Sequence, residues 1–208
     1  MGLITRKPAV LVLEDGSVFE GFSLGKIGVA TGEICYNTGM TGYQEIYTDP
    51  SYFGQIIINT SSHIGNYGTV EDEQESSSPQ ISGVIINEYS EIYSRSNSDE
   101  SLEDYFIKNN TVAIYDIDTR KLVKYIRDKG AMNAIISSES QDVEKLKSSL
   151  DKVPSMKNLE LSSKVTTEKE YEFGDKNSKI KIAVLDLGCK QSIPVSYTHL
   201  TLPTIMPV

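Results

Sequence analysis

Two polar, glycine-bearing loops, each following a short apolar run, constrain the fold of this chain more than any other feature of its sequence. The run 34–36 favours a β-strand and breaks into the loop 37–42, which is dense in small and hydroxylated residues. A second expected strand, 55–59, leads into the loop 61–68. Glycines let such loops adopt a positive φ or approach another group closely. Because loops of this kind commonly carry function, we expect both to face a ligand or a partner.

The rest of the sequence predicts a domain of mixed strands and helices. Asp15-Gly16 is a strong hairpin signal between strands at 10–13 and 17–22. Further strands are expected at 84–86, 112–115 and 133–137. Helices are expected after a cap at Ser98 or Asp99, over 120–129 with Asp118 and Thr119 at its start and Gly130 at its end, and over 142–152. This order indicates an α/β or α+β layered domain that ends near residue 152.

Charge and apolar pattern exclude several classes of partner. The formal net charge is −9, whereas nucleic acids and anionic membranes need a basic face. No apolar run approaches the ~20 residues of a membrane-spanning helix, and residues 1–8 hold no apolar core of signal-peptide length. Cys35 and Cys189 suit a reduced, cytoplasmic protein better than a disulfide. The acidic stretch 70–80 indicates an exposed loop and not a metal site, because it lacks glycine-centred ligand spacing.

The motifs at 37–46, 48–52 and 63–68 together resemble the small, glutamine-hydrolysing subunit of carbamoyl phosphate synthase. The resemblance runs from Ala9 to Ile193. It also includes the segments 13–16, 116–122 and 127–132.

The resemblance implies that the chain has four parts. Residues 1–152 would form the N-terminal domain of the small subunit, with mixed β and α layers, and the polar residues 153–179 a linker. Residues 180–193 would begin a flavodoxin-like class I glutamine amidotransferase domain, truncated after its first strand. Residues 194–208 depart from the family pattern, with three prolines and no helical period. We interpret them as an artefactual tail and expect them to be disordered or unpacked.

The function that the resemblance implies is the release of ammonia from glutamine for a large subunit, which uses it with bicarbonate and ATP. The product would be carbamoyl phosphate, for arginine and pyrimidine synthesis. The partners would be the large subunit and L-glutamine, with ATP and Mg²⁺ bound by the large subunit and no cofactor or metal bound by this chain. A non-catalytic interaction domain is the alternative. A nucleotide-binding domain is disfavoured, because no Gly-x-Gly-x-x-Gly or phosphate-loop motif follows an expected strand.

Hydrolysis of the glutamine amide needs a nucleophile and a base. By resemblance, the family's catalytic Cys, His and Glu lie beyond this chain, so we expect no catalytic residue in it. Cys189 follows a strand and a glycine, as a nucleophile does, but the resemblance assigns it to the turn after the first strand. We expect Cys35 to be a packed thiol and His63 to be a structural hydrogen bonder and not a base. The other histidine, His199, lies in the tail.

Three residues carry the remaining site expectations. By resemblance, Ser51 contributes to glutamine binding, and its hydroxyl suits contact with the polar backbone of an amino acid; from the residues alone, Ser51 stabilises its own turn. Also by resemblance, Met40 lies near the route by which ammonia leaves, since an apolar side chain can line such a path without protonating the amine. Lys190 would help to close that region. Ordinary packing or surface exposure is the alternative for Met40 and Lys190.

Overall fold

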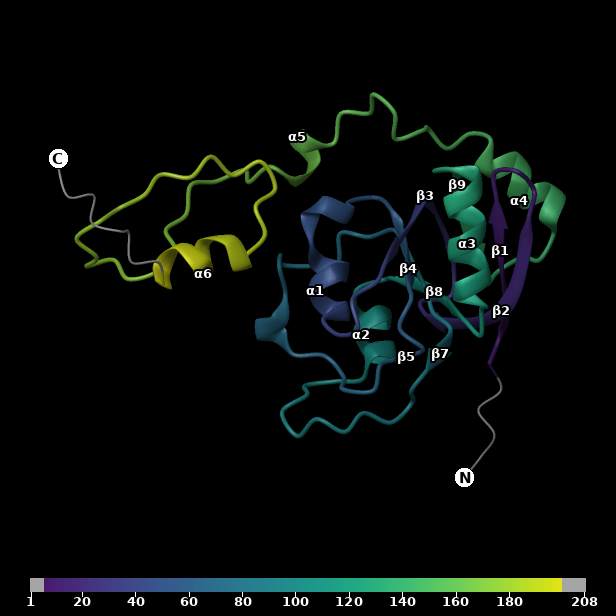
Figure 1. The fold of residues 1–208 in the computed structure, drawn as a ribbon, viewed down its shortest axis with the longest axis horizontal. Helices are drawn as coiled ribbons and strands as arrows, with labels where there is room; N and C mark the ends of the chain where they lie inside the picture. Colours follow the sequence, from purple (N-terminus) through teal and green to yellow (C-terminus); the bar gives the residue numbers. More distant parts are fainter. Residues whose placement is uncertain (1–5, 200–208) are drawn as a thin grey trace.

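Seven strands close into a barrel within residues 6–199, the part of the chain that the computed structural model describes (Figure 1). Around the barrel they follow the order β1, β2, β8, β6, β4, β3, β9. Their bounds are β1 (Pro8–Leu13), β2 (Val18–Gly25), β3 (Val29–Asn37), β4 (Ile56–Asn59), β6 (Gly83–Ile85), β8 (Val112–Tyr115) and β9 (Asn133–Ser137). A separate two-stranded sheet pairs β5 (His63–Ile64) with β7 (Glu88–Tyr89). The mixed α/β class is confirmed, but the sheet closes on itself and is not an open layer.

The barrel combines antiparallel and parallel pairing. The expected hairpin is present, since β1 and β2 are antiparallel with Val12 opposite Val18. The pairs β2–β8, β1–β9 and β3–β9 are also antiparallel. In contrast, β4 is parallel to both β3 and β6, and β6 is parallel to β8. The Asp15-Gly16 hairpin signal favours antiparallel pairing in the strand-rich first half, and this is wrong for β3 and β4, whose connection is long enough to hold a helix.

Alternation along the strands divides the apolar residues between the two faces of the barrel wall. In β1, Ala9, Leu11 and Leu13 belong to the interior cluster, whereas Val10 and Val12 belong to a cluster on the outer face. The strand β4 alternates in the same way. Because helices cover much of the outer face, both faces of these strands are buried and their sequences read as continuous apolar runs.

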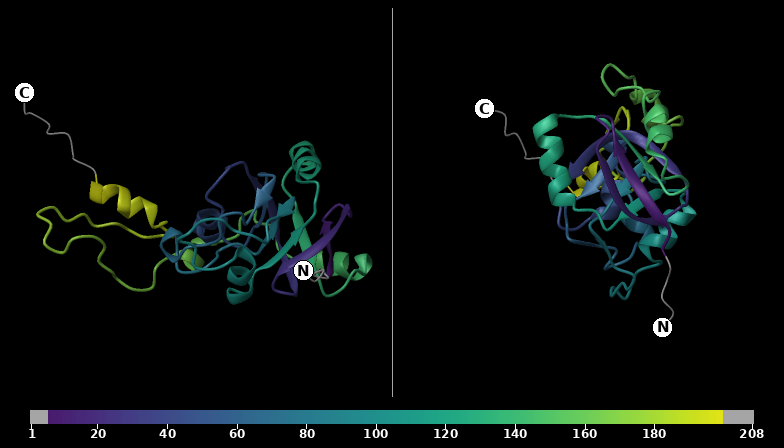
Figure 2. Two further views of the ribbon diagram at one scale, coloured as in Figure 1. Left: turned by 90° about the horizontal axis from the view of Figure 1, so that it is seen from below. Right: turned by 90° about the vertical axis from the view of Figure 1, so that its right-hand side faces the viewer.

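Helices pack around the outside of the barrel (Figure 2). They are α1 (Tyr43–Thr48), α2 (Leu102–Lys108), α3 (Thr119–Lys129) and α4 (Val143–Leu150). Helices α1 and α2 share one outer cluster, and α4 covers another. Helix α3 adds Leu122 and Ile126 to the interior cluster, so its apolar face helps to seal the barrel.

Side-chain caps fix the starts of three of these helices. Asp118 caps α3, as expected, and Asp142 caps α4; each carboxylate accepts from the backbone N–H three residues later. Helix α2 is capped by Ser101. The expected cap at Ser98 or Asp99 is wrong, because both side chains instead bond backbone groups of the loop before β6.

The chain beyond residue 152 leaves the barrel and extends to one side (Figure 2). The expected linker, 153–179, is largely exposed and holds only the short helix α5 (Ser162–Val165) among its described residues. Over 180–188, all of which is described, no strand forms, so the expected first amidotransferase strand is absent there. Its apolar side chains, such as Ile180 and Leu185, are exposed because no described strand lies beside them.

The start of the tail lies in α6 (Ser192–His199). The tail is expected to be disordered or unpacked; over 194–199 it is helical, and its Val195 and Tyr197 side chains are exposed. Pro194 is tolerated because it lies in the first turn, where a helix does not need the backbone N–H. The rest of the tail, 200–208, lies outside the described residues. Between residues 6 and 199, no helix combines the length and apolar character needed to cross a bilayer.

Candidate functional site

The two polar loops leave the barrel at the same end because β3 and β4 are parallel neighbours. Asn37 and Asn59, the last residues of these strands, lie opposite each other. Residues 38–42 follow the first strand as the first loop, and residues 60–70, which include β5, follow the second strand as the second loop. The amide of Thr60 donates to the Asn37 carbonyl at 3.2 Å and joins the starts of the two loops. Sequence composition marks both loops, whereas their adjacency comes from the strand pairing.

Met40 stands on a short loop that is fixed at both ends. At its start, the Asn37 side chain accepts from the Gly39 amide at 2.7 Å and donates to the Tyr52 hydroxyl at 3.0 Å. At its end, the Tyr67 hydroxyl accepts two backbone N–H groups at the start of α1. The Met40 side chain between these points is 78% exposed. It is therefore not packed within its own domain.

Hydrogen bonds, two of them buried, tie α1 to the end of β4 and to the second loop. The hydroxyls of Tyr43 and Tyr47 donate to the Gly68 carbonyl at 2.5 Å and to the Asn59 side chain at 2.6 Å. The Gln44 side chain both donates to and accepts from the backbone of one residue in that loop. Burial raises the pKa of both tyrosines, so their hydroxyls keep their protons and remain donors. Sequence reasoning missed these contacts; the only local signal is that Tyr43 and Tyr47 share one helical face.

Ser51 lies at the surface of the turn after α1. The turn forms because Asp49 Oδ1 accepts the Ser51 amide at 2.9 Å at the start of the 3₁₀ helix η1 (Pro50–Tyr52). The Ser51 side chain is exposed. The other carboxylate oxygen of Asp49 lies 3.4 Å from the Lys190 ammonium. The structure therefore brings Ser51 and Lys190 together through Asp49, while Met40 lies at the opposite end of α1.

The segment after the linker contacts the same side of the barrel. The backbone amides of Gln191 and Ser192 donate to the carbonyl of Glu75 at 2.9 Å and to its carboxylate at 2.8 Å. With the Lys190 ion pair, these bonds anchor the start of α6 on the side of the barrel that carries α1, as Figure 1 shows. The point at which the chain continues past its linker is thus fixed beside the turn that carries Ser51, at the end of α1 away from Met40.

The cysteines and His63 do not form a nucleophile–base pair among the described side chains. Burial, together with the Glu33 carboxylate, raises the pKa of Cys35 to about 12. Burial and nearby carboxylates also raise the pKa of Cys189, so both thiols stay protonated at neutral pH. Both are free of disulfides. His63 pairs with Glu88 instead, its Nδ1 lying 3.2 Å from that carboxylate.

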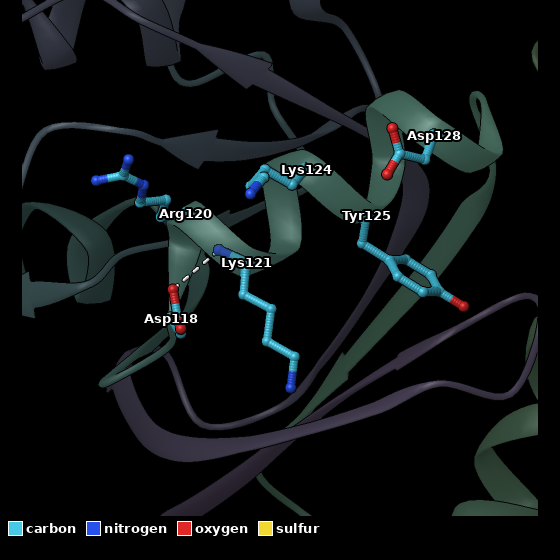
Figure 3. A pocket seen from close by; sticks show the side chains of 6 residues that line it. All are labelled: Asp118, Arg120, Lys121, Lys124, Tyr125 and Asp128. Carbon is cyan, nitrogen blue, oxygen red and sulfur yellow. Dashed lines mark hydrogen bonds between the residues drawn. The ribbon is translucent and has the colours of Figure 1, made fainter.

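A hollow on the surface of α3, of about 450 Å³, does not bring its side chains together (Figure 3). The basic side chains Arg120, Lys121 and Lys124 fan out from the helix instead of converging. The Asp118 carboxylate is used by the helix cap, and the Tyr125 hydroxyl donates to a carboxylate in the β1–β2 turn. Asp118 and Arg120 belong to the start of the helix, as expected, and the loops around α1 remain the candidate site.

A family model described as carbamoyl-phosphate synthase small chain, CPSase domain, matches residues 11–136, more than half of the chain. Proteins called carbamoyl phosphate synthase small chain from Synechococcus sp., Chlorobaculum tepidum and Aquifex aeolicus are 42%, 44% and 43% identical to it. These matches cover 93%, 89% and 90% of this chain and 52%, 51% and 54% of the relatives. The chain thus spans about half the length of the curated relatives it matches. It belongs to the carbamoyl-phosphate synthase small chain family.

Proposed function

We propose that this chain is the N-terminal half of the small subunit of a glutamine-dependent carbamoyl phosphate synthase, which frees ammonia from glutamine for a large subunit. The matched family and the names of the relatives support this proposal. The enzyme would be a cytoplasmic ligase that serves arginine and pyrimidine synthesis. The catalytic Cys, His and Glu would lie in the half of the subunit that follows these residues. ATP and Mg²⁺ would bind to the large subunit.

One observation carries the proposal for Ser51, namely the ion pair of 3.4 Å between Lys190 and Asp49. It ties the segment after the linker to the turn that exposes the Ser51 hydroxyl. A second half that continues from this segment would begin beside that hydroxyl. Since a hydroxyl both donates and accepts, it can bind either charged group of an amino acid. We therefore assign Ser51 to the wall of the glutamine site.

Met40 and Lys190 suit the path by which ammonia would leave. Met40 is exposed on a loop fixed at both ends, and its thioether offers no proton to ammonia. The Lys190 ammonium, held by Asp49, would close one side of the path. Both assignments depend on the second half of the subunit covering this face.

The test is to mix the full-length subunit with its large subunit and to measure carbamoyl phosphate formed from glutamine or from ammonia. Ser51→Ala should raise KM for glutamine about tenfold or more, because it removes a hydrogen bond to a charged group. Ammonia-dependent synthesis should not change. Ser96→Ala, at another exposed serine, is the control. Synthesis from ammonia but never from glutamine would contradict the proposal.

The second candidate is a non-catalytic interaction domain, favoured by the lack of contact between a cysteine and His63 among the described residues. Under both candidates, the chain of 208 residues alone should hydrolyse no glutamine. The full-length subunit with its large partner separates them. If that pair also hydrolyses no glutamine, the interaction domain replaces the enzyme subunit as the better assignment.

A further inference from the structure

We infer that Tyr67 is a positioning residue, whose hydroxyl caps α1 from outside the helix and thereby fixes the loop that presents Met40. The inference rests on the proposed function, in which this loop faces the rest of the enzyme. Tyr67 belongs to the second loop and is not among the residues proposed to bind glutamine or to line the ammonia path, which are Ser51, Met40 and Lys190.

Helix α1 begins without a side-chain cap of its own. Its N-cap residue is Gly42, with a left-handed φ of 80° and no side chain to offer. The first N–H groups of a helix have no partner within the helix, and Ser, Thr, Asp or Asn at the N-cap commonly satisfies one of them. Here the Tyr67 hydroxyl accepts the Gly42 amide at 2.7 Å and the Tyr43 amide at 3.1 Å. Both acceptor sites of the hydroxyl oxygen are therefore used.

The ring of Tyr67 is itself held in place. The Tyr43 ring stacks on it with a centroid distance of 4.2 Å and an interplanar angle of 15°. The Arg95 guanidinium lies 5.6 Å from the ring centroid and is bound to Glu73 at 2.8 Å. Burial raises the pKa of Tyr67, so the phenol is neutral at physiological pH. The cap thus has a fixed position and a constant charge.

Fixing the start of α1 also fixes the loop before it. Only residues 38–41 lie between the contact made by Asn37 and the contact made by Tyr67, and the exposed Met40 is among them. Loss of the cap would let these residues sample more conformations. Met40 would then leave its place against the rest of the enzyme for part of the time. Ammonia would escape to solvent, and glutamine would be hydrolysed without forming carbamoyl phosphate.

Tyr67→Phe in the full-length subunit, assembled with its large subunit, tests this role, because it removes the hydroxyl and keeps the stacked ring. Hydrogen exchange at the Gly42 and Tyr43 amides should become about fivefold faster, and glutamine hydrolysed per carbamoyl phosphate should rise about twofold or more, as expected for a lost helix cap. Ammonia-dependent synthesis should stay unchanged. A general loss of stability would lower ammonia-dependent synthesis as well, whereas the positioning role predicts a change only in the glutamine hydrolysed per carbamoyl phosphate.

Tyr125→Phe is the matched control, since that hydroxyl donates to Asp15 at 2.5 Å from α3, and it should change neither quantity. Unchanged exchange in Tyr67→Phe would overturn the capping role. Faster exchange with an unchanged ratio of glutamine hydrolysed to carbamoyl phosphate formed would overturn the positioning role. If the unmodified pair makes no carbamoyl phosphate from glutamine, the proposed function fails instead, and the exchange measurement still decides whether Tyr67 caps α1.

Discussion

Glu45, in the first turn of α1, is a residue whose charge opposes folding. One of its carboxylate oxygens is buried with no hydrogen-bond partner among the described residues. Burial raises the pKa of Glu45, and the carboxylates of Glu73 and Glu75 add to this shift, while a bond to its own N–H and the nearby Arg95 oppose it. The folded state therefore binds the proton more tightly than the unfolded state. Stability is full at low pH and falls as pH rises through the folded pKa.

Glu45→Gln should therefore melt at a higher temperature than the unmodified chain at about pH 8, with a smaller difference at about pH 4, where the carboxyl is protonated. Glutamine keeps the volume and the acceptor for the N–H of residue 45. Thermal melts at both pH values provide the measurement. Glu139→Gln, at an exposed site, should shift neither melt. An equal gain at both pH values would indicate better packing instead of the removal of a charge.

Cys35 should react slowly with alkylating agents in the folded chain. With a pKa of about 12, only about one Cys35 in ten thousand is a thiolate at about pH 8, and the thiolate is the reactive form. Cys189, on the segment outside the barrel, should be labelled first by iodoacetamide. Mass spectrometry after timed quenching measures both sites. Labelling at equal rates in the folded chain would contradict the burial of Cys35, whereas equal rates in denaturant are expected.

At the scale of elements, α3 allows the contribution of one cap to be measured. Asp118 Oδ1 accepts from the Lys121 amide at 2.9 Å, and the helix places Leu122 and Ile126 in the interior cluster. Asp118→Ala should lower the free energy of unfolding by about 1 kcal/mol, whereas Asp118→Asn should cost much less because Asn caps equally well. Urea denaturation of both variants gives the comparison. Equal losses would assign the effect to charge at the helix terminus.

Elements that depend on neighbouring residues are predictable from this sequence. The Asp15-Gly16 hairpin, the strand Asn133–Ser137 and the Asp118 cap each use chemistry within a few positions, and all three agree with the structure. The loops that carry Ser51 and Met40 also stand out by composition. The contacts of those loops could not be predicted. Tyr67, for example, caps a helix that begins 24 positions earlier, and no local sequence pattern indicates this contact.

Elements that depend on distant partners are not predictable in this way. The parallel pairing of β3 with β4 belongs to a barrel that closes only when β9 pairs with both β1 and β3. The run 180–188 has the composition of a strand, but a strand needs a neighbour to satisfy its backbone groups, and no described strand provides one. Local composition indicates that a segment can form a strand, and the presence of a neighbouring strand decides whether it does.

At the scale of the whole molecule, the barrel and the segment after the linker differ in how they bury apolar residues. The strands of the barrel are buried on both faces, whereas five side chains of the segment are between 55% and 83% exposed: Ile180, Ile182, Val184, Leu185 and Leu187. Burying each such side chain would contribute about 1.5 kcal/mol or more. An apolar run of this kind is therefore suited to enter a sheet wherever further strands are available.

We expect residues 180–187 to become a buried strand in the full-length subunit. Their amides should exchange rapidly in the chain of 208 residues and at least about a hundredfold more slowly in the full-length protein, because sheet hydrogen bonds open only with local unfolding. Hydrogen exchange with mass spectrometry measures both forms. The amides of β9, buried in the barrel, provide an internal control and should exchange alike in the two. Rapid exchange at 180–187 in both forms would mean that this segment enters no sheet, and the amidotransferase domain proposed to begin at residue 180 would then be wrong.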